Sequence, residues 1–205
     1  MVTCLDRKAV TVVAATRLEA DAVRAAAPGV RVVTSGIALR RCRGAFDPGD
    51  GELVVSCGVA GALRSDLPTG SVVIPETVLR PSGEVLVCDS ELVAALDRAA
   101  RRLGFEPLRA PLLTSATLVT GTARREWAER GYASVDMETG LIEAPRVAAV
   151  RVILDTPGRE ISAAWLRPAT ALLRPRAWGQ AIWLMREAPR CARIAAAVLA
   201  NALGV

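Results

Sequence analysis

Short apolar runs rich in β-branched residues recur along this sequence, and stretches with helical periodicity separate them. Val10–Ala15, Val30–Thr34, Leu53–Cys57 and Val147–Leu154 each have the length and composition of a buried strand. Strands that alternate with helices favour a largely parallel sheet that is covered by helices on both faces. We therefore predict a three-layer α/β fold with a largely parallel or mixed central sheet flanked by helices.

Weaker patterns predict the remaining elements. Extended segments are expected at Ser71–Val78, Pro111–Val119 and Ala133–Asp136, and helices at Leu18–Ala27, at Ala123–Arg130 and from an N-cap at Ser90 to Leu103. The region 160–205 is predicted to be helical, with one helix at Ala177–Glu187 and a second that has Pro189 in its first turn. Neither a repeat nor a linker divides the sequence, so we interpret residues 1–205 as a single domain.

The sequence contains no histidine, which excludes several kinds of catalytic site. Ser-His-Asp catalysis, Cys-His catalysis and the common zinc hydrolase sites all require an imidazole. The five cysteines are scattered and form no CxxC pair, which is typical of reduced thiols in a cytoplasmic protein and not of a metal site or a disulfide framework. Any acid–base chemistry must therefore rely on carboxylates or on groups of the substrate.

Arginines are concentrated in the C-terminal part of the sequence. The net charge is +5, and residues 146–205 hold nine arginines but only three acidic residues. We expect no nucleic-acid partner, because the sequence lacks an aromatic–basic RNA motif and a recognisable helix-turn-helix. Two interpretations stay open: a solvated face on helices that pack against the sheet, or a peripheral contact of 165–205 with an anionic membrane through Trp165, Trp178 and Trp183.

Two segments at strand ends carry residues suited to a ligand. The segment LVVSCGVAGAL at 53–63 leads from a strand into a turn, where Gly58 and Gly61 let the backbone approach a ligand closely. The segment VDMET at 135–139 places Asp136 and Glu138 at another strand end, where ligands bind in open α/β sheets. A carboxylate can accept hydrogen bonds from both hydroxyls of a ribose, although acidic residues also suit a helix N-terminus.

Other polar residues follow apolar runs in the same way. Asp155 closes the run VAAVRVIL before a Pro-Gly turn, and it is interpreted either as a turn residue or as a general acid. Glu19 follows the first strand and is either an exposed first-turn helix residue or a site residue on the same sheet edge. Ser35 and Gly36 follow the second strand and form either a simple turn or a phosphate-binding loop.

The order and relative spacing of these segments resemble the nucleoside phosphorylase/nucleosidase superfamily over most of residues 10–155. The resemblance rests on SCGVAGAL with LPTGSVVIP behind it, on SVDMETG, and on the apolar strand that ends in Asp155. The segment VRVILDTPGREIS, with the Trp- and Pro-punctuated region after it, is most similar to the hopanoid-associated phosphorylases, which act on adenosylhopane. The resemblance implies cleavage of the N-glycosidic bond of a purine nucleoside, with no cofactor and with inorganic phosphate as a candidate co-substrate.

The resemblance also implies roles for individual residues. Met137 and Glu138 would bind the ribose, with Glu138 on its 2′- and 3′-hydroxyls. Asp155 would protonate or hydrogen-bond purine N7, and Glu19 would position a nucleophilic water. The base would lie along Thr117, Leu118 and Val119, and the phosphate or water side would be formed by Ser35, Gly36, Arg40, Cys57 and Gly58.

Two features depart from the family pattern. The connection between Glu138 and Asp155 is several residues shorter than is common, so its helix is expected to be truncated or missing. Leu154 replaces the small hydroxyl residue often found before the acid, which weakens the network that orients Asp155.

Three activities remain open from the sequence. The first is phosphorolysis of an adenosylhopane-like substrate in hopanoid biosynthesis, which Arg40 or Arg41 behind Ser35 would favour by holding phosphate. The second is hydrolysis of methylthioadenosine, adenosylhomocysteine or a futalosine-like substrate, which Glu19 favours. The third is non-catalytic binding of a purine nucleoside. In each case we expect a small-molecule nucleoside, free or lipid-linked, as the partner and a homodimer or larger homo-oligomer as the assembly.

Overall fold

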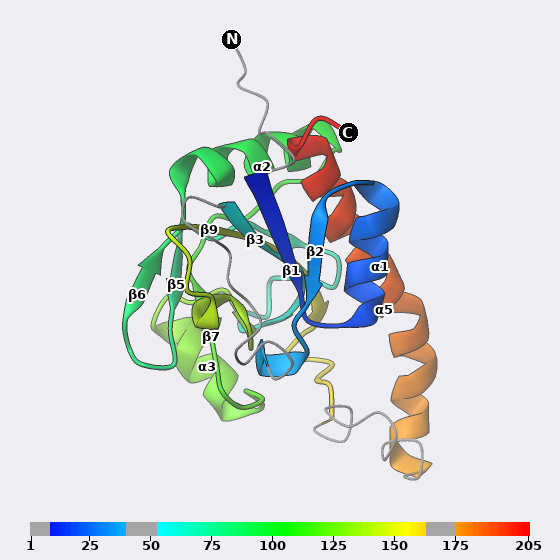
Figure 1. Cartoon of the computed structure of the whole chain (residues 1–205). Coiled ribbons are helices and arrows are strands. Elements are labelled where there is room, and N and C mark those ends of the chain that lie inside the picture. Colours follow the sequence, from blue (N-terminus) through cyan, green and yellow to red (C-terminus); the bar gives the residue numbers. More distant parts are fainter. Residues whose placement is uncertain (1–8, 40–52, 163–174) are drawn as a thin grey trace.

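A computed structural model describes residues 9–39, 53–162 and 175–205. Within these ranges the chain forms a mixed nine-stranded sheet with helices around it (Figure 1). The elements are, in order, β1 (Val10–Ala14), α1 (Arg17–Ala26), β2 (Arg31–Thr34), the 3-10 helix η2 (Ile37–Leu39), β3 (Leu53–Ala62), β4 (Val72–Val73), β5 (Thr77–Leu79), β6 (Val85–Val87), α2 (Ser90–Arg102), β7 (Leu112–Thr114), α3 (Thr122–Glu129), β8 (Ser134–Asp136), the 3-10 helix η3 (Thr139–Leu141), β9 (Arg146–Asp155) and α5 (Pro175–Ala202).

The long strand β3 organises the sheet. One edge of β3 pairs with the parallel strand β9 along nearly its whole length. The other edge pairs first with the parallel strand β1, as far as Ser56, and then with the antiparallel strand β8, from Gly61. Between these two partners a short stretch of β3 has no strand neighbour on that edge within the described residues. This interruption in the sheet is where a ligand can approach the backbone.

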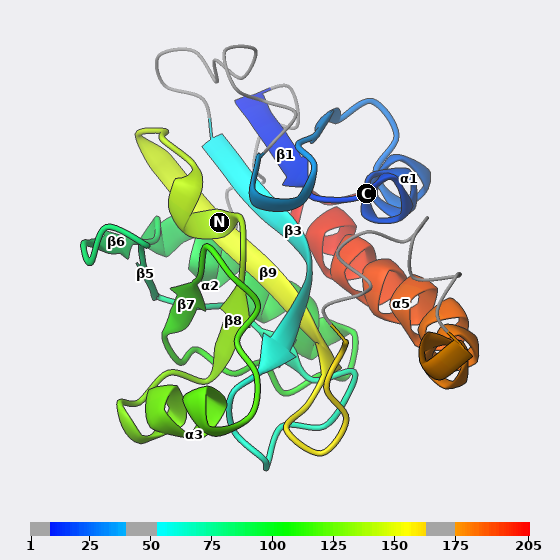
Figure 2. The same ribbon diagram turned by 90° about the horizontal axis from the view of Figure 1, so that it is seen from below.

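Side chains that alternate along the strands supply two apolar layers. Val10 and Val12 of β1 face a core that α1, α2 and α5 cover, whereas Val13 faces a smaller cluster on the opposite side. Figure 2 shows α1 and α5 side by side against β1, β3 and β9, while α3 lies beyond the end of β8. The predicted α/β fold, with a mixed sheet flanked by helices, is therefore confirmed.

Three of the differences from the predicted element boundaries have a clear physical cause. The strand expected at Ser71–Val78 is divided into β4 and β5 around Pro75, which has no amide hydrogen to donate to a ladder. The N-cap of α2 is Asp89 and not Ser90, because the Asp89 carboxylate accepts a hydrogen bond of 3.0 Å from the Leu92 amide. β3 continues five residues past Cys57 because β9 pairs with it through the glycine-containing segment.

The helix at the C-terminus is continuous, so the prediction of two helices divided at Pro189 is wrong. A proline inside a helix removes one hydrogen bond, and burial of the residues around it offsets that loss. Cys191, Val198 and Leu199 of α5 are fully buried against the sheet. Packing of one helical face therefore overrides the local stop signal.

The expected membrane contact is altered by the packing of α5. Trp183 is buried in the core, and the Arg159 guanidinium stacks on its ring at 4.5 Å, so Trp183 is not a surface anchor. Ile182 and Met185 are exposed. Trp165 and the side chain of Trp178 lie outside the described residues. Among the described helices, α5 included, none combines the length and apolarity needed to span a bilayer.

Candidate functional site

A cavity of about 320 Å³ opens beside the interruption in the sheet. It brings together four residues predicted from the sequence to form a site, namely Glu19, Met137, Glu138 and Asp155, together with Leu118 of the predicted base segment. The other lining residues are Ala15, Thr16, Ile37, Val59, Ala60, Gly61, Val135, Asp136, Leu154, Ile161, Leu184 and Ala188. The cavity is thus mostly apolar, with carboxylates at a few positions, as is typical of small-molecule sites.

Glu19 is held rigidly at the start of α1. Its Oε2 accepts hydrogen bonds from the Thr16 amide at 2.8 Å and the Thr16 hydroxyl at 2.7 Å, and the Thr16 hydroxyl caps the helix in return. Its Oε1 accepts a hydrogen bond of 2.9 Å from the Val59 amide, in the unpaired stretch of β3. Glu19 is only 3% exposed and lines the cavity, so it is not a solvated helix acid.

Arg151 of β9 is a buried cation beneath the cavity that the sequence analysis did not identify. Its guanidinium forms an ion pair of 2.6 Å with Asp136 and donates hydrogen bonds to the Ser56 hydroxyl at 2.6 Å and the Thr139 hydroxyl at 2.8 Å. Its Nε is buried without a hydrogen-bond partner among the described residues. A lone arginine in the apolar run VAAVRVIL was the available signal, because arginine is rarely buried without a charged partner.

Glu138 lies close to this arginine, on the same side of the cavity. Its Oε1 accepts a hydrogen bond of 3.0 Å from the amide of Ala38, which has a left-handed backbone with φ of 55°. Burial and the negative charge of Asp136 together raise the pKa of Glu138 to about 7, although the nearby Arg151 cation lowers it. Glu138 therefore changes its charge close to neutral pH.

Asp155 ends β9 at a different part of the cavity and is bound by a second buried arginine. Its Oδ2 accepts a short hydrogen bond from Nη2 of Arg124, and the two side chains form an ion pair. Arg124 comes from the first turn of α3 and is 1% exposed. No sequence signal separates it from the neighbouring Arg125, which is exposed.

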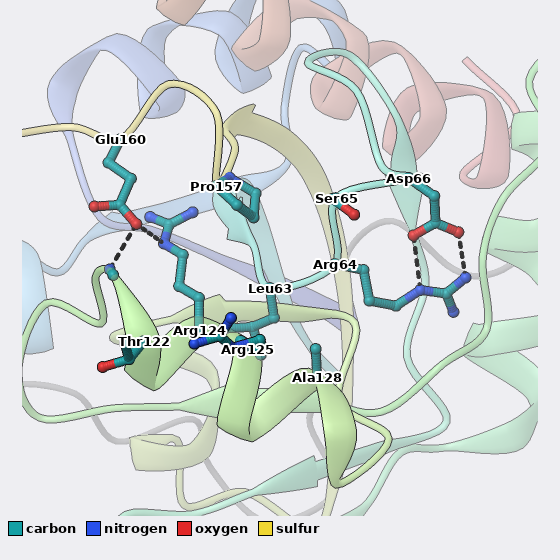
Figure 3. Close-up of a pocket in the computed structure, with 11 residues that line it drawn as sticks. Leu63, Arg64, Ser65, Asp66, Thr122, Arg124, Arg125, Ala128, Pro157 and Glu160 are labelled. Carbon is teal, nitrogen blue, oxygen red and sulfur yellow. Dashed lines mark hydrogen bonds and ion pairs between the residues drawn. The ribbon is translucent and has the colours of Figure 1, made fainter.

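A larger cavity of about 660 Å³ lies on the other side of Arg124 (Figure 3). There Glu160 accepts a hydrogen bond of 2.7 Å from the Gly121 amide and lies 3.4 Å from Nε of Arg124. Arg64 and Asp66 form an ion pair across the cavity from Glu160 (Figure 3). The acidic and basic side chains of this cavity thus largely neutralise one another.

Several residues predicted for the site do not line the 320 Å³ cavity. Thr117 is exposed, and Val119 is buried in an apolar cluster with Leu63, so only Leu118 of the base segment reaches the cavity. A loop that crosses the edge of the cavity presents only one of three successive side chains to it, which the sequence could not specify.

The predicted phosphate or water side is also only partly assembled. The Ser35 hydroxyl is buried on the carbonyls of Ala14 and Gly36, and Cys57 points into the core, where burial raises the pKa of its thiol to about 12. Gly58 lies directly against the Glu19 carboxylate and the Arg151 guanidinium. Arg40 lies outside the described residues.

The shortened connection before Asp155 has the expected consequence. Between Glu138 and β9 the chain forms only the three-residue 3-10 helix η3, so the helix expected to be truncated or missing is reduced to a single turn. Leu154 also supplies no polar side chain next to Asp155. The Thr69 hydroxyl donates to the Leu154 carbonyl at 2.9 Å and not to the carboxylate.

The charges divide the cavity into two ends. Glu19, Asp136 and Glu138 surround Arg151 at one end, and their charges act on one another through the buried space. Asp155, paired with Arg124 behind it, lies at the other end. A ligand that spans the cavity would meet an acidic, hydrogen-bond-accepting end that suits hydroxyl groups, and a carboxylate at the opposite end that suits a group carrying a proton.

Comparison with known proteins gives one family match and several solved structures of similar fold. The family model of the phosphorylase superfamily matches residues 32–144. Among solved structures, a Helicobacter pylori 5′-methylthioadenosine nucleosidase mutant with 5′-methylthioadenosine in its active site is 14% identical, with 98% of this chain and 99% of that chain covered and a TM-score of 0.70. The native futalosine hydrolase of Helicobacter pylori is 13% identical, with 97% and 98% covered and a TM-score of 0.72.

A third structure extends the likeness to another organism. The 5′-methylthioadenosine/S-adenosylhomocysteine nucleosidase of Neisseria meningitidis, in complex with methylthio-immucillin-A, is 17% identical, with 96% and 99% covered and a TM-score of 0.69. No curated protein matches the chain. At these low identities the structural likeness establishes the fold over nearly the whole chain.

Proposed function

Because the chain belongs to the phosphorylase superfamily, we propose that it cleaves the N-glycosidic bond of a purine nucleoside, with adenine as the leaving base. The observation that carries this proposal is the single cavity that joins Glu19, Glu138 and Asp155. The resemblance to the superfamily implies one carboxylate each for the nucleophile, the ribose and the base, and these three residues would supply them. The nucleosidases of similar fold bind nucleosides and their analogues, which supports the same substrate class here.

The two ends of the cavity, one with Glu19, Asp136 and Glu138 and the other with Asp155, fit the charge changes of glycosidic cleavage. As the C1′–N9 bond breaks, its electron pair leaves with the purine and the ribose gains positive charge. Glu138 would accept hydrogen bonds from the ribose hydroxyls, and the carboxylates around it stabilise the cationic sugar. Asp155 would hydrogen-bond or protonate N7 of the purine, which makes the base a better leaving group.

We propose water as the nucleophile. In the described part of the cavity the sugar end holds Glu19, Asp136 and Glu138 against the single cation of Arg151. A phosphate dianion would be repelled by this excess of carboxylates, whereas a neutral water would be attracted and oriented by Glu19. Water oxygen would then bond to C1′, one proton passing to Glu19 and the base leaving with the electron pair.

The size of the cavity bears on the group at the 5′ position. Ligand sites usually measure about 300–1,000 Å³, so a cavity of about 320 Å³ suits one nucleoside with a small apolar 5′ substituent. Ile161, Leu184 and Ala188 supply an apolar wall for such a group. An adenosylhopane-like substrate stays a prediction, and its pentacyclic tail would have to extend outside this cavity.

The test is release of the base by the purified full-length protein, with and without phosphate. The panel holds 5′-methylthioadenosine, S-adenosylhomocysteine, adenosine and inosine, and the sugar product, with any 5′ substituent it keeps, is analysed as the free sugar or its 1-phosphate. We expect phosphate-independent release of adenine and free sugar. Strict dependence on phosphate, with ribose 1-phosphate as product, would reassign the nucleophile. No release from any nucleoside would reject the enzyme and favour a binding protein.

A further inference from the structure

We propose that Arg124 is a positioning residue for Asp155, whose guanidinium fixes the carboxylate so that its second oxygen faces the leaving base. The proposal rests on the proposed function. Arg124 itself does not line the 320 Å³ cavity, so it can act on the base only through Asp155.

The guanidinium is anchored independently of Asp155. Its Nε donates a hydrogen bond of 3.0 Å to the Val119 carbonyl, and its Nη1 donates one of 2.7 Å to the carbonyl of Ala62, the last residue of β3. These two bonds hold the plane of the group between β3 and the segment that precedes α3. The Nη2 atom is then directed at Asp155. Arg124 is therefore the fixed partner, and Asp155 adapts to it.

The pair leaves one oxygen of Asp155 for a ligand. Oδ2 is occupied by Arg124, whereas a Cβ atom placed on Gly61, which lines the cavity, would lie 3.0 Å from Oδ1. Oδ1 thus lies over the cavity wall at the base end. As the C1′–N9 bond breaks and negative charge develops on the purine, a proton that Oδ1 of Asp155 has taken up from solvent would pass to N7, and the guanidinium would stabilise the carboxylate that remains.

Arg124 is the one side chain among the described residues that forms a hydrogen bond or ion pair with the Asp155 carboxylate. The residue before Asp155 is Leu154, whose side chain has no donor, and the Thr69 hydroxyl donates to the Leu154 backbone instead. Lysine at 124 would keep the charge, but it lacks the planar fork that serves two carbonyls and a carboxylate at once. The geometry therefore requires arginine.

Stability alone is a poor explanation for this pair. Both side chains are buried, 1% and 7% exposed, and burying two charges carries a desolvation penalty that their attraction often only offsets. Apolar residues of similar size are frequently as stabilising at such positions. The location of this pair at the wall of the cavity is instead what a group that orients a reacting carboxylate requires.

The test is a double-mutant cycle of Arg124→Met and Asp155→Asn, read out by kcat and KM for release of adenine. We expect Arg124→Met to lower kcat by on the order of 10²-fold, the loss typical of a misplaced catalytic group, with a smaller change in KM. In the Asp155→Asn background the same substitution should change kcat about twofold or less, because residues that act as one unit are not additive. Arg124→Lys should restore part of the loss, and Arg125→Met, on the exposed face of α3, is the matched control.

Two results would overturn the proposal: a wild-type kcat for Arg124→Met, or losses that multiply in the double variant, which would indicate an independent structural role. Circular dichroism and thermal unfolding accompany each variant. If Arg124→Met does not fold, the test uses the uncharged double variant, Arg124→Met with Asp155→Asn, and Arg124→Lys. A kcat of Arg124→Lys equal to wild type would show that the planar guanidinium is not needed.

The same cycle by calorimetry with free adenine separates this proposal from the proposed function. Non-additive losses of adenine affinity without turnover by the wild type would support Arg124 and reject the enzyme. Additive losses of adenine affinity with normal turnover would reject the role of Arg124 and support the enzyme. If the wild type neither binds adenine nor turns over a nucleoside, both proposals are overturned.

Discussion

Alanine at position 58 is expected to disable the nucleophile end of the cavity. A Cβ atom on Gly58 would lie closer than 3.0 Å to Oε1 of Glu19 and 2.9 Å from Nη1 of Arg151. Arg151 is held by Asp136 and by neighbouring hydroxyls, so Glu19 must move and lose its bond to the Val59 amide. A hydrogen bond to a charged group contributes about 1.5–3 kcal/mol. At roughly 2–4 °C per kcal/mol for a chain of this size, Tm should fall by about 3–12 °C.

The activity should fall further than the stability. A catalytic group displaced by about 1 Å can cost on the order of 10²-fold in rate, so kcat for adenine release by Gly58→Ala should drop by about that factor. The assays are thermal unfolding by circular dichroism and base release under saturating nucleoside. Gly179→Ala is the control, because nothing lies within 4 Å of the added Cβ in the helix α5 and alanine there should stabilise the fold by about 0.5–1 kcal/mol. A wild-type Tm and kcat for Gly58→Ala would refute the packing of Glu19 against β3.

Three further predictions follow from the same structure. Asp155→Asn should keep the fold and lower kcat by about 10²–10⁴-fold, because the amide cannot deliver a proton; a wild-type kcat would remove Asp155 from the reaction. The pKa of Glu138 is raised to about 7, so the affinity for ribosides, measured by calorimetry, should weaken as pH falls through 7 and the carboxylate becomes neutral. The free energy of unfolding should change in the opposite sense: the contribution of the buried neutral form is complete below the ordinary pKa of a glutamate and is lost as pH rises through 7. Glu138→Gln should abolish both dependences and spare the binding of free adenine. Because Ile182 and Met185 are exposed on α5, Ile182→Ser with Met185→Ser should weaken salt-sensitive co-sedimentation with anionic vesicles without lowering Tm, and an absence of binding by the wild type at low ionic strength would exclude membrane contact.

The fold class could be predicted because burial leaves a direct pattern in the sequence. The runs at Val10–Ala14 and Arg146–Asp155 are apolar on both faces, and only a strand covered on both sides needs that composition. Boundaries were less predictable, since a proline or a capping residue is a local signal that packing can override. Pro189 is the clearest case, because the buried face of α5 keeps the helix intact across it.

Part of the candidate site could also be predicted. Glu19 follows β1 and Asp155 ends β9, and both strands run parallel to β3, so both residues had to lie at the carboxyl end of these strands. Asp136 ends β8 and Glu138 follows it; β8 runs antiparallel to β3, and these residues reach the cavity only because β8 joins β3 beyond the end of β1. That arrangement depends on pairing between distant segments and has no local signature.

The sequence by itself determined most of the strands and helices and which carboxylates stand at strand ends, because side-chain periodicity and turn residues act over a few neighbouring positions. The tertiary structure alone decided the electrostatics of the cavity. Arg151 meets Asp136, and Arg124 meets Asp155, across sequence separations that no periodic pattern spans. A buried cation lowers the cost of nearby buried carboxylates only when it lies within a few ångströms of them. The partners of these carboxylates, and therefore the chemistry proposed for them, were fixed only when the sheet and α3 brought the charges together.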